Sequence, residues 1–203
     1  MMRLFLVRHG QSEWNAGRRL QGQADTALSD HGRNQARALA ATVQALQPER
    51  IIASDLTRTR ETANLLGYGE HETDSNLREI DVGAWSGRAI EDLMAEDEAA
   101  FLGWRAGTYT PPEGESWRRF KARSLVALAD ARETAARSVL LVIHGGVIRA
   151  LLEGLLDLSP ARIVPVGPAS LTVLRLDEPN GTASARLEVF NYTPDAPVFN
   201  APD

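Results

Sequence analysis

Two histidines in the chain each follow a short apolar run and precede a glycine. Residues 4–7 lead into Arg8-His9-Gly10, and residues 139–143 lead into His144-Gly145-Gly146. An apolar, β-branched run of this length is typical of a buried strand, and a glycine directly after it lets the backbone approach a ligand. Both histidines are therefore predicted at the carboxyl ends of strands, where open α/β sheets bind their ligands. An arginine beside a histidine there suits the binding of an anion and nucleophilic attack on it.

A third segment supplies another cation. Residues 54–63 follow a short apolar run at residues 51–53 and place Arg58 in the first turn of a predicted helix. Helix N-termini and arginine side chains both favour phosphate. From these residues alone, the competing interpretation is that the charged groups simply end their strands and helices in solvent.

Four motifs, taken in order, resemble a known family. Arg8-His9-Gly10, the pattern of Leu56, Arg58, Thr62 and Ala63 within residues 54–63, Leu77-Arg78-Glu79 and His144-Gly145-Gly146 resemble the histidine phosphatase superfamily, also called phosphoglycerate mutase-like. The matches run from residue 4 to about residue 150. Residues 77–87 look like the phosphatase branch of that superfamily. The resemblance implies a metal-independent phosphatase that hydrolyses small phosphate monoesters through a phosphohistidine on His9.

Five residues can carry that reaction. A phosphate monoester dianion needs charge neutralisation, an in-line nucleophile and a proton for the leaving oxygen. His9, neutral at one ring nitrogen, can attack phosphorus, while Arg8 and Arg58 clamp the non-bridging oxygens. A protonated His144 would donate to the same oxygens, and Glu79 would protonate the leaving oxygen and later activate water. The resemblance implies the same five catalytic roles.

Four further residues are candidates for substrate binding. Asn15 matches a phosphate-contacting position of the family, and Gln21 and Gly22 are candidates in the same long loop. Gly145 would offer a backbone N–H at a helix N-terminus. The alternative for Asn15 and Gln21 is hydrogen bonding inside their own loop.

Other polar residues near the motifs rank lower. Asp81 is a distant second choice as the acid, because it would share the face of Glu79 in an extended segment. Glu13 is another nearby carboxylate. His31 and His71 fall outside the motifs and are expected at the surface.

Three other functions compete with a phosphatase. Two histidines and two carboxylates could ligate zinc, but Arg8 beside His9 would repel the cation. A cofactor-dependent phosphoglycerate mutase and a non-catalytic phospho-ligand-binding protein are the remaining alternatives. Mutases of the superfamily are usually longer and carry an asparagine-glutamate-arginine-histidine stretch where this chain has residues 77–87.

Composition narrows the class of protein. The chain has 203 residues, 43% of them hydrophobic and 24% charged, which fits one domain with a substantial core. A net charge of −5 gives no reason to expect nucleic acid or a membrane as a partner. Cysteine is absent, and no apolar run is long enough for a signal peptide or a membrane span. We expect a cytoplasmic monomer or homodimer without a cofactor or metal, whose partner is a small phosphorylated metabolite.

The elements that must position these residues alternate between strands and helices. The predicted fold is α/β, a three-layer sandwich with a mostly parallel central sheet and an antiparallel edge strand, over a single domain of residues 1–203. Strands are predicted at residues 3–7, 50–53, 139–143, 170–176 and 186–192, helices at 30–46, 56–66, 115–136 and 146–156, and a long loop at 8–28. Residues 72–76 are predicted as a short strand or loop, and Asn180-Gly181 as a hairpin turn. The tail after Pro194 is predicted to be irregular.

Residues 77–137 interrupt this alternation. Short helical patterns at 90–94 and 99–102 predict a helical cap insertion at about 85–115 over the active-site face, with an ordinary packed helix pair as the alternative. Its aromatic residues are candidates for the pocket wall or for the core: Trp85, Trp104, Tyr109 and Trp117. The sequence does not specify which phosphorylated alcohol they would recognise.

Overall fold

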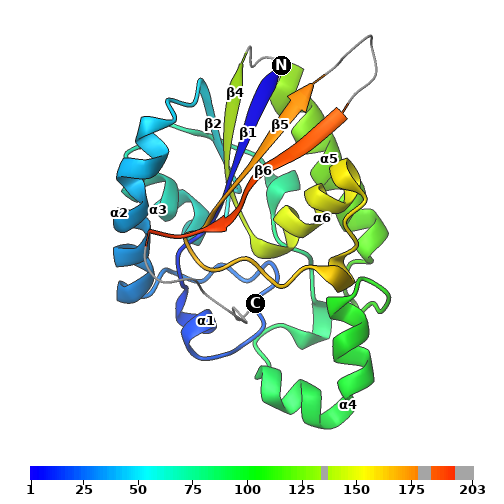
Figure 1. The fold of residues 1–203 in the computed structure, drawn as a ribbon. Coiled ribbons are helices and arrows are strands. Elements are labelled where there is room, and N and C mark those ends of the chain that lie inside the picture. The colour runs from blue at the N-terminus through cyan, green and yellow to red at the C-terminus, as the bar shows by residue number, and fades with distance from the viewer. Residues whose placement is uncertain (134–136, 178–183, 195–203) are drawn as a thin grey trace.

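The computed structural model describes residues 1–133, 137–177 and 184–194, which form a three-layer α/β sandwich (Figure 1). The described strands make a sheet in the order β3-β2-β4-β1-β5-β6. They are β1 (Met2–Arg8), β2 (Arg50–Ala53), β3 (Glu72–Thr73), β4 (Ser138–Ile143), β5 (Leu171–Asp177) and β6 (Ser184–Tyr192). β1 to β4 run parallel, while β5 and β6 are antiparallel to their neighbours. The predicted fold class is therefore confirmed.

The register of the two central strands places the two histidines together. β1 pairs in parallel with β4, and Arg8 lies opposite Ile143 in that pairing. Both strands are apolar and almost fully buried, because each is covered on both faces. The His9 amide donates to the Ile143 carbonyl over 2.9 Å, so His9 and His144 leave the sheet side by side.

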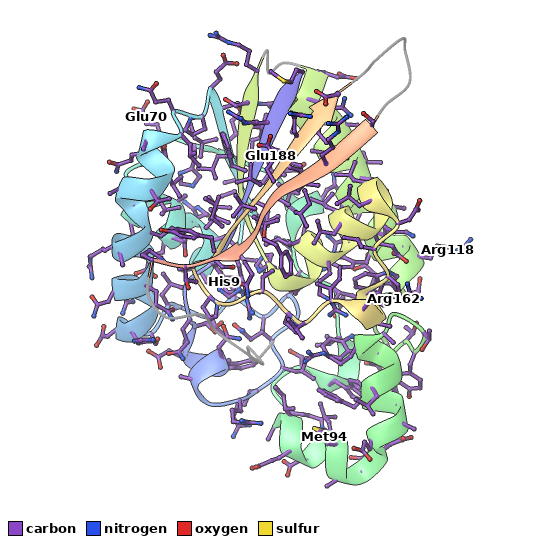
Figure 2. All side chains as sticks on the ribbon, in the orientation of Figure 1. His9, Glu70, Met94, Arg118, Arg162 and Glu188 are labelled. Atoms are coloured by element: carbon purple, nitrogen blue, oxygen red, sulfur yellow. The ribbon has the colours of Figure 1, made fainter. Side chains whose placement is uncertain are left out.

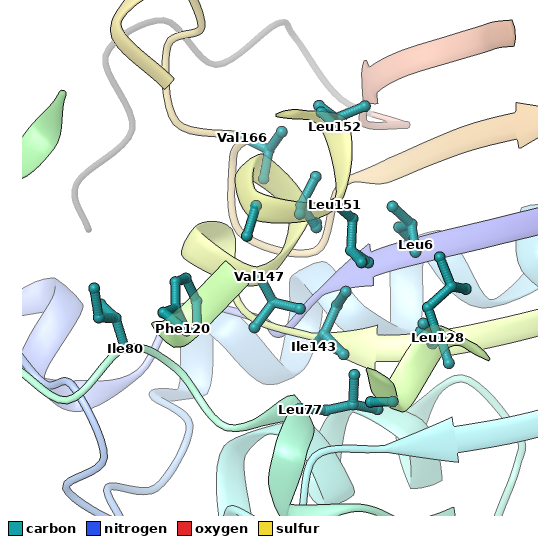
Figure 3. Packing of buried hydrophobic residues seen from close by; sticks show 14 of the residues in the cluster. Leu6, Leu77, Ile80, Phe120, Leu128, Ile143, Val147, Leu151, Leu152 and Val166 are labelled. Carbon is teal, nitrogen blue, oxygen red and sulfur yellow. The ribbon is translucent and has the colours of Figure 1, made fainter. Parts of the chain in front are cut away.

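Helices cover both faces of the sheet. α2 (Asp30–Ala45) and α3 (Thr57–Leu65) pack on the face that carries Phe5 and Val7. α5 (Trp117–Glu133) and α6 (Gly145–Leu156) pack on the opposite face, which carries Leu4 and Leu6. Figure 3 shows this second core, where Leu6, Ile143, Leu128 and Leu151 meet between strands and helices. Alternation along β1 thus supplies both cores from one strand.

The segment after β3 departs from the layered pattern. Before α5 it contains two short 3₁₀ turns, η1 (Ser75–Leu77) and η2 (Gly83–Trp85), and one full helix, α4 (Ile90–Arg105). α4 stands beyond the carboxyl ends of the parallel strands (Figure 1). The two predicted helical pieces are joined into α4 with a kink at Asp97, where φ is −155° and ψ is 87°. The Asp97 side chain accepts from the Ala100 amide over 2.9 Å, so it caps the second piece as an N-cap residue would.

Two short elements were not predicted from the sequence, and one of them lies in the predicted loop of residues 8–28. A short helix, α1 (Glu13–Ala16), forms in that loop because Ser12 and Asn15 make a reciprocal capping box. A further 3₁₀ turn, η3 (Pro160–Arg162), lies between α6 and β5. The predicted turn at Asn180-Gly181 and the tail from residue 195 lie outside the described residues. Across the described ranges, no helix combines the length and apolar character that crossing a bilayer demands.

Candidate active site

A small cavity lies at the carboxyl ends of the parallel strands. Figure 2 labels His9 at this edge of the sheet. The cavity brings together four of the five predicted catalytic residues, and His144 packs against His9 with 5.2 Å between the ring centroids. The lining residues are Arg8, His9, Leu20, Gln21, Gly22, Arg58, Glu79, Ile80, Val82, Trp104, Trp117, Gly146 and Arg149.

His9 is held in one tautomer. Its Nδ1 lies 2.7 Å from the Gly10 carbonyl oxygen, and because a carbonyl can only accept, Nδ1 carries the proton. Nε2 then keeps its lone pair. Burial lowers the pKa of His9 well below its ordinary value, with Arg58 and Arg8 adding to the effect, so the ring is neutral at pH 7. A neutral imidazole fixed through Nδ1 is the form that can attack phosphorus.

The loop after His9 is fixed by close packing on two helices. The Gly10 amide donates to Thr62 Oγ1 over 3.1 Å, and that hydroxyl donates in turn to the Arg58 carbonyl. A Cβ on Gly10 would lie 2.3 Å from the Gly32 carbonyl oxygen, so the loop can sit on α2 only as glycine. The motif residue Thr62 therefore couples the His9 loop to the helix that carries Arg58.

Two buried arginines flank His9. Arg8 Nη1 donates to the Val166 carbonyl over 2.5 Å, and Arg58 donates through Nη1 to Ala24 and through Nη2 to Gly22, over 2.7 and 2.9 Å. These carbonyl bonds fix the guanidinium planes. Burial lowers the pKa of Arg58 to about 10, so it remains a cation at neutral pH. The buried Arg58 Nε has no protein partner within the described residues, as expected of a donor that serves a ligand.

His144 lies beside His9 behind the cavity lining. It is fully buried, and within the described part of the chain neither ring nitrogen has a hydrogen-bond partner. Burial and then Arg58 lower the pKa of His144 well below its ordinary value, with further contributions from His9, Arg8 and Arg123. The neutral ring is thus favoured until an anion offsets these cations. A bound phosphate dianion would raise this pKa, since an opposite charge favours the imidazolium.

Glu79 is held by two backbone amides. Oε1 accepts from the Ile80 amide and Oε2 from the Gly146 amide, both over 2.9 Å. Each oxygen keeps a second lone pair, so the carboxyl group can still exchange a proton with a substrate. A Cβ on Gly146 would lie 2.1 Å from Oε1, so the glycine makes room for the carboxyl group.

Arg123 of α5, which the sequence did not single out, secures the segment that carries Glu79. Its Nη1 donates to the Asn76 and Arg78 carbonyls over 2.7 Å, and its Nη2 donates to the Glu79 carbonyl over 2.9 Å. The same guanidinium forms a two-pronged ion pair with Glu115, at 2.9 and 2.8 Å. The carboxylate is therefore positioned from both its side chain and its backbone.

The four predicted substrate-binding residues fall in different places. Gln21 and Gly22 line the cavity, with Gln21 Oε1 accepting from Ser12 and Thr26. Asn15 does not line the cavity. Its Oδ1 accepts from the Ser12 amide, and its own amide donates to Ser12 Oγ, which closes the α1 capping box. A Cβ on Gly145 would make ordinary contact with Arg8, and it is the neighbouring Gly146 that lines the cavity.

The rival carboxylates lie elsewhere. Asp81 is not part of the cavity lining, and its Oδ1 accepts from the Gly83 amide over 2.9 Å. Glu13 is exposed on α1. Within the described ranges, no group of three or more histidine, aspartate and glutamate side chains is arranged to hold a metal ion.

Of the four candidate aromatic residues, two reach the cavity. Trp104 and Trp117 form part of its wall. Trp85 is buried against α4 and stacks on Tyr109, which is exposed, with 5.6 Å between the ring centroids. Arg149 also lines the cavity, and sequence analysis missed it. The sequence does hold a signal for it, because Arg149 is the one charged residue in the otherwise apolar helical run of residues 147–152.

The fold and this site together define an enzyme that acts on phosphate esters through a histidine. The histidine phosphatase superfamily (branch 1) matches residues 4–188, and the chain belongs to that family. The resemblance noted from its motifs is confirmed, as is the enzyme class, a phosphoric monoester hydrolase.

Relatives in two bacteria are similar over most of the chain. A glucosyl-3-phosphoglycerate phosphatase of Mycobacterium tuberculosis is 39% identical over 81% of this chain and 80% of its own. A probable phosphoglycerate mutase of Klebsiella pneumoniae is 39% identical over 78% of this chain and 76% of its own. The solved structure of a mycobacterial glucosyl-3-phosphoglycerate phosphatase complexed with VO3 superposes with a TM-score of 0.87 at 38% identity, covering 95% of this chain and 100% of that one.

Proposed function

We propose that the chain hydrolyses small phosphate monoesters by a two-step, metal-independent reaction in which His9 carries the phosphoryl group. The observation that carries this proposal is the hydrogen bond from His9 Nδ1 to the Gly10 carbonyl, 2.7 Å long, in a cavity flanked by Arg8 and Arg58. It leaves Nε2 as an unprotonated nucleophile between two cations. Esters related to phosphoglycerate are the first substrates to test, because the similar mycobacterial enzyme is named for one.

In the first step, the arginines neutralise the non-bridging oxygens while His9 Nε2 attacks phosphorus. The P–N bond forms as the bond to the alcohol oxygen breaks, and Glu79 supplies the proton that this oxygen needs. His144, charged once the dianion is bound, adds a donor to the phosphoryl oxygens. Because the hydrogen bonds of the folded site already orient these side chains, they need not reorient when charge develops in the transition state.

In the second step, water replaces the departed alcohol. Glu79, now a carboxylate, takes a proton from the water as it attacks phosphorus, and the P–N bond breaks to release inorganic phosphate. His9 is regenerated in its original tautomer, because the Gly10 carbonyl still holds the Nδ1 proton.

Two guanidinium groups perform the charge neutralisation that a divalent cation provides in other phosphoryl-transfer sites. Their proximity would also repel such a cation. The proposal further takes residues 1–203 as one domain whose segment at about 85–115 caps the site. It takes the enzyme as cytoplasmic, as a monomer or homodimer, without a nucleic acid or membrane partner.

Steady-state hydrolysis of 3-phosphoglycerate and p-nitrophenyl phosphate tests the function. Phosphate release should persist in excess chelator, and His9→Asn should reduce turnover by several orders of magnitude, as loss of a nucleophile does elsewhere. Activity that vanishes with chelator and returns with magnesium or zinc would refute the metal-independent reaction. Full activity in His9→Asn would refute the assigned nucleophile.

A mutase reaction is the second candidate, because the probable phosphoglycerate mutase is as similar as the phosphatase. The two outcomes differ in what accepts the phosphoryl group: water, or a hydroxyl of the bound glycerate. Phosphorus NMR of 3-phosphoglycerate with enzyme separates them. We expect inorganic phosphate to accumulate; formation of 2-phosphoglycerate without net phosphate release would favour the mutase.

A further inference from the structure

Apolar side chains form much of the wall of the catalytic cavity. They come from the loop after α1, from the segment that follows Glu79, and from the helices α4 and α5; they are Leu20, Ile80, Val82, Trp104 and Trp117. Because Ile80 directly follows Glu79 in the chain, an alcohol whose oxygen meets Glu79 lies beside this wall. The wall therefore suits the carbon skeleton of the alcohol.

The two tryptophans of this wall differ in what their indole N–H groups bind. Trp117 Nε1 donates to Glu153 Oε2 over 2.7 Å, so its hydrogen bond is made within the protein. Trp104 is only 8% exposed, and its buried Nε1 has no hydrogen-bond partner among the described residues. An indole nitrogen can only donate, and a buried indole N–H ordinarily has an acceptor. Since Trp104 lines the cavity, we expect its acceptor to come from a bound ligand.

Packing fixes the Trp104 ring before any substrate binds. The ring lies against Phe101, three residues earlier on α4, with 5.7 Å between the centroids, and meets Trp85 edge-on at 6.1 Å. Both neighbours are themselves buried, so the Trp104 ring has little room to turn. Neither neighbouring side chain offers an acceptor, because phenylalanine has no polar atom and the Trp85 indole only donates. A donor that is oriented in advance loses little freedom when its ligand arrives.

A single N–H donor in an apolar wall discriminates between alcohols by their oxygen atoms. An alcohol with a hydroxyl, ether or carbonyl oxygen at this point satisfies the donor, whereas an all-carbon analogue leaves the N–H buried and unpaired. Sites built on a buried donor reject such analogues more strongly than apolar pockets reject a small change in size. The indole carries no charge, so a neutral acceptor oxygen is sufficient.

We propose that Trp104 is a specificity-determining residue whose indole N–H donates to an oxygen in the alcohol part of the substrate. The preferred substrates are then phosphate monoesters whose alcohol combines a carbon skeleton with an acceptor oxygen beyond the ester bond. This inference rests on the proposed function, because it takes the scissile phosphate to lie at His9. Trp104 takes no part in bond breaking.

Steady-state kinetics with two matched pairs of esters tests this contact. The pairs are 2-methoxyethyl phosphate with butyl phosphate, and 3-methoxypropyl phosphate with pentyl phosphate. Within a pair, one CH₂ is replaced by an ether oxygen, which can accept a hydrogen bond but cannot donate one. The ether preference is the ratio of kcat/KM for the ether ester to that for its alkyl partner.

Trp104→Phe keeps an aromatic ring and removes the N–H. In at least one pair, the ether preference of the wild-type enzyme should exceed that of Trp104→Phe by about fivefold or more, as expected for one hydrogen bond to a buried donor. Comparing ratios cancels the cost of removing the ether oxygen from water, since this cost is the same for both proteins.

Trp117→Phe is the matched control, because it removes an indole N–H from the same wall, but one that is bonded to Glu153. It can slow both members of a pair, yet it should keep the ether preference of the wild-type enzyme. An ether preference in Trp104→Phe that equals the wild-type value in both pairs would overturn the inference. So would an equal loss of the preference in Trp117→Phe.

Nitrogen-15 NMR of the indole groups in the His9→Ala protein tests the same contact with Trp104 in place and without turnover. The Trp104 indole proton should shift further downfield with at least one ether ester than with its alkyl partner, because a hydrogen bond deshields the proton. The Trp117 indole proton should respond equally to both members of a pair. Equal shifts of the Trp104 proton within both pairs would overturn the inference.

Together, the two measurements separate this inference from the proposed function. If the Trp104 proton distinguishes the esters but the wild-type enzyme hydrolyses none of them, the contact stands and the proposed function fails. If the esters are hydrolysed but neither the Trp104 proton nor Trp104→Phe distinguishes them, the function stands and the contact fails.

Discussion

At the residue scale, the site keeps two imidazoles neutral among cations. Burial is the largest cause of the lowered pKa of both His9 and His144, and Arg58 comes next for each. In the proposed reaction, the neutral His9 attacks phosphorus, and His144 acquires its proton when the anion binds. The same arrangement makes the free energy of unfolding depend on pH. An unfolded histidine binds a proton near pH 6.5, whereas the folded histidine, with its lowered pKa, stays neutral there.

We therefore predict that the free energy of unfolding falls as the pH drops below about 6.5. Each histidine with a lowered pKa contributes a loss of up to about 1.4 kcal/mol per pH unit, since the unfolded chain binds one more proton. Urea denaturation at pH 7.5, 6.5 and 5.5 measures this slope. His144→Gln should remove one histidine's share, while His31→Gln, a change at an exposed residue, should not. A slope of zero across this range would contradict the neutral assignment.

Glu79 can be told apart from Asp81 by leaving-group dependence. General acid catalysis is worth roughly 10²–10⁴-fold and matters most for a poor leaving group. Glu79→Gln should depress phosphoryl transfer from an alkyl ester far more than the burst from an aryl phosphate, which releases a stable phenolate. The second step also suffers, so burst and steady state are measured separately by rapid quench.

Asp81→Asn is the matched control for that test, since Asp81 bonds the Gly83 amide outside the cavity. It should leave the ratio of alkyl to aryl rates unchanged. Equal slowing of both first steps in Glu79→Gln would mean that Glu79 is not the acid.

At the scale of elements, the site depends on how α5 and α6 hold the segment of Glu79. Arg123 on α5 donates hydrogen bonds to three backbone carbonyls and to the Glu115 carboxylate. Among side chains, only a guanidinium has enough N–H donors in one plane to make all of these bonds. The side chains of Arg123 and Glu115 are 18% and 9% exposed, so solvent screens their ion pair little. Arg123 is thus a positioning residue that acts through Glu79.

Arg123→Lys should lower alkyl phosphate turnover about tenfold or more while the burst with an aryl phosphate changes little. Lysine keeps the charge but reaches fewer acceptors, so the Glu79 backbone is less well fixed. The control variant is Arg118→Lys, which makes the same change at an exposed position of α5. Arg118 is labelled in Figure 2. Equal loss with alkyl and aryl substrates would assign Arg123 a purely structural role.

The two glycines at the start of α6 give a second test. In Gly146→Ala, the new Cβ would meet Glu79 Oε1 at 2.1 Å, and the carboxyl group must move. In Gly145→Ala, the Cβ meets Arg8 at an ordinary 3.5 Å. Gly146→Ala should reproduce the leaving-group dependence of Glu79→Gln, with a much smaller effect for Gly145→Ala. Thermal denaturation checks that both variants fold, and equal kinetics of the two would contradict the contact.

Elements were predictable where apolar periodicity is strong and less so where side chains cap the backbone. The buried runs of β1 and β4 and the helices between them follow from their patterns. The four residues of α1 do not, because the reciprocal bonds of Ser12 and Asn15 create that helix. The Asp97 kink has the same origin, a polar side chain that competes with the helix for an amide.

At the scale of the whole molecule, the sheet converts motifs far apart in sequence into one site. His9 and His144 each follow a parallel strand, so the convergence was predictable once the strands were paired as neighbours. The positions of Arg123 and Arg149 in the site could not be predicted in this way. Helical periodicity indicates which residues are buried, but not which backbone carbonyl or cavity a buried cation contacts. Asn15 shows the converse, because it matches a family position that contacts phosphate, yet here it hydrogen-bonds Ser12 in the α1 capping box.

The most direct test of the central claim is to trap the phosphoenzyme. Wild-type enzyme mixed with an aryl phosphate, quenched within milliseconds under alkaline conditions and digested, should yield a peptide that carries one phosphoryl group on His9. The label should be lost in acid, as a P–N bond requires, and should be missing from His9→Asn. A phosphoryl group on another residue, or rapid hydrolysis with no phosphoenzyme formed at any time, would contradict the account.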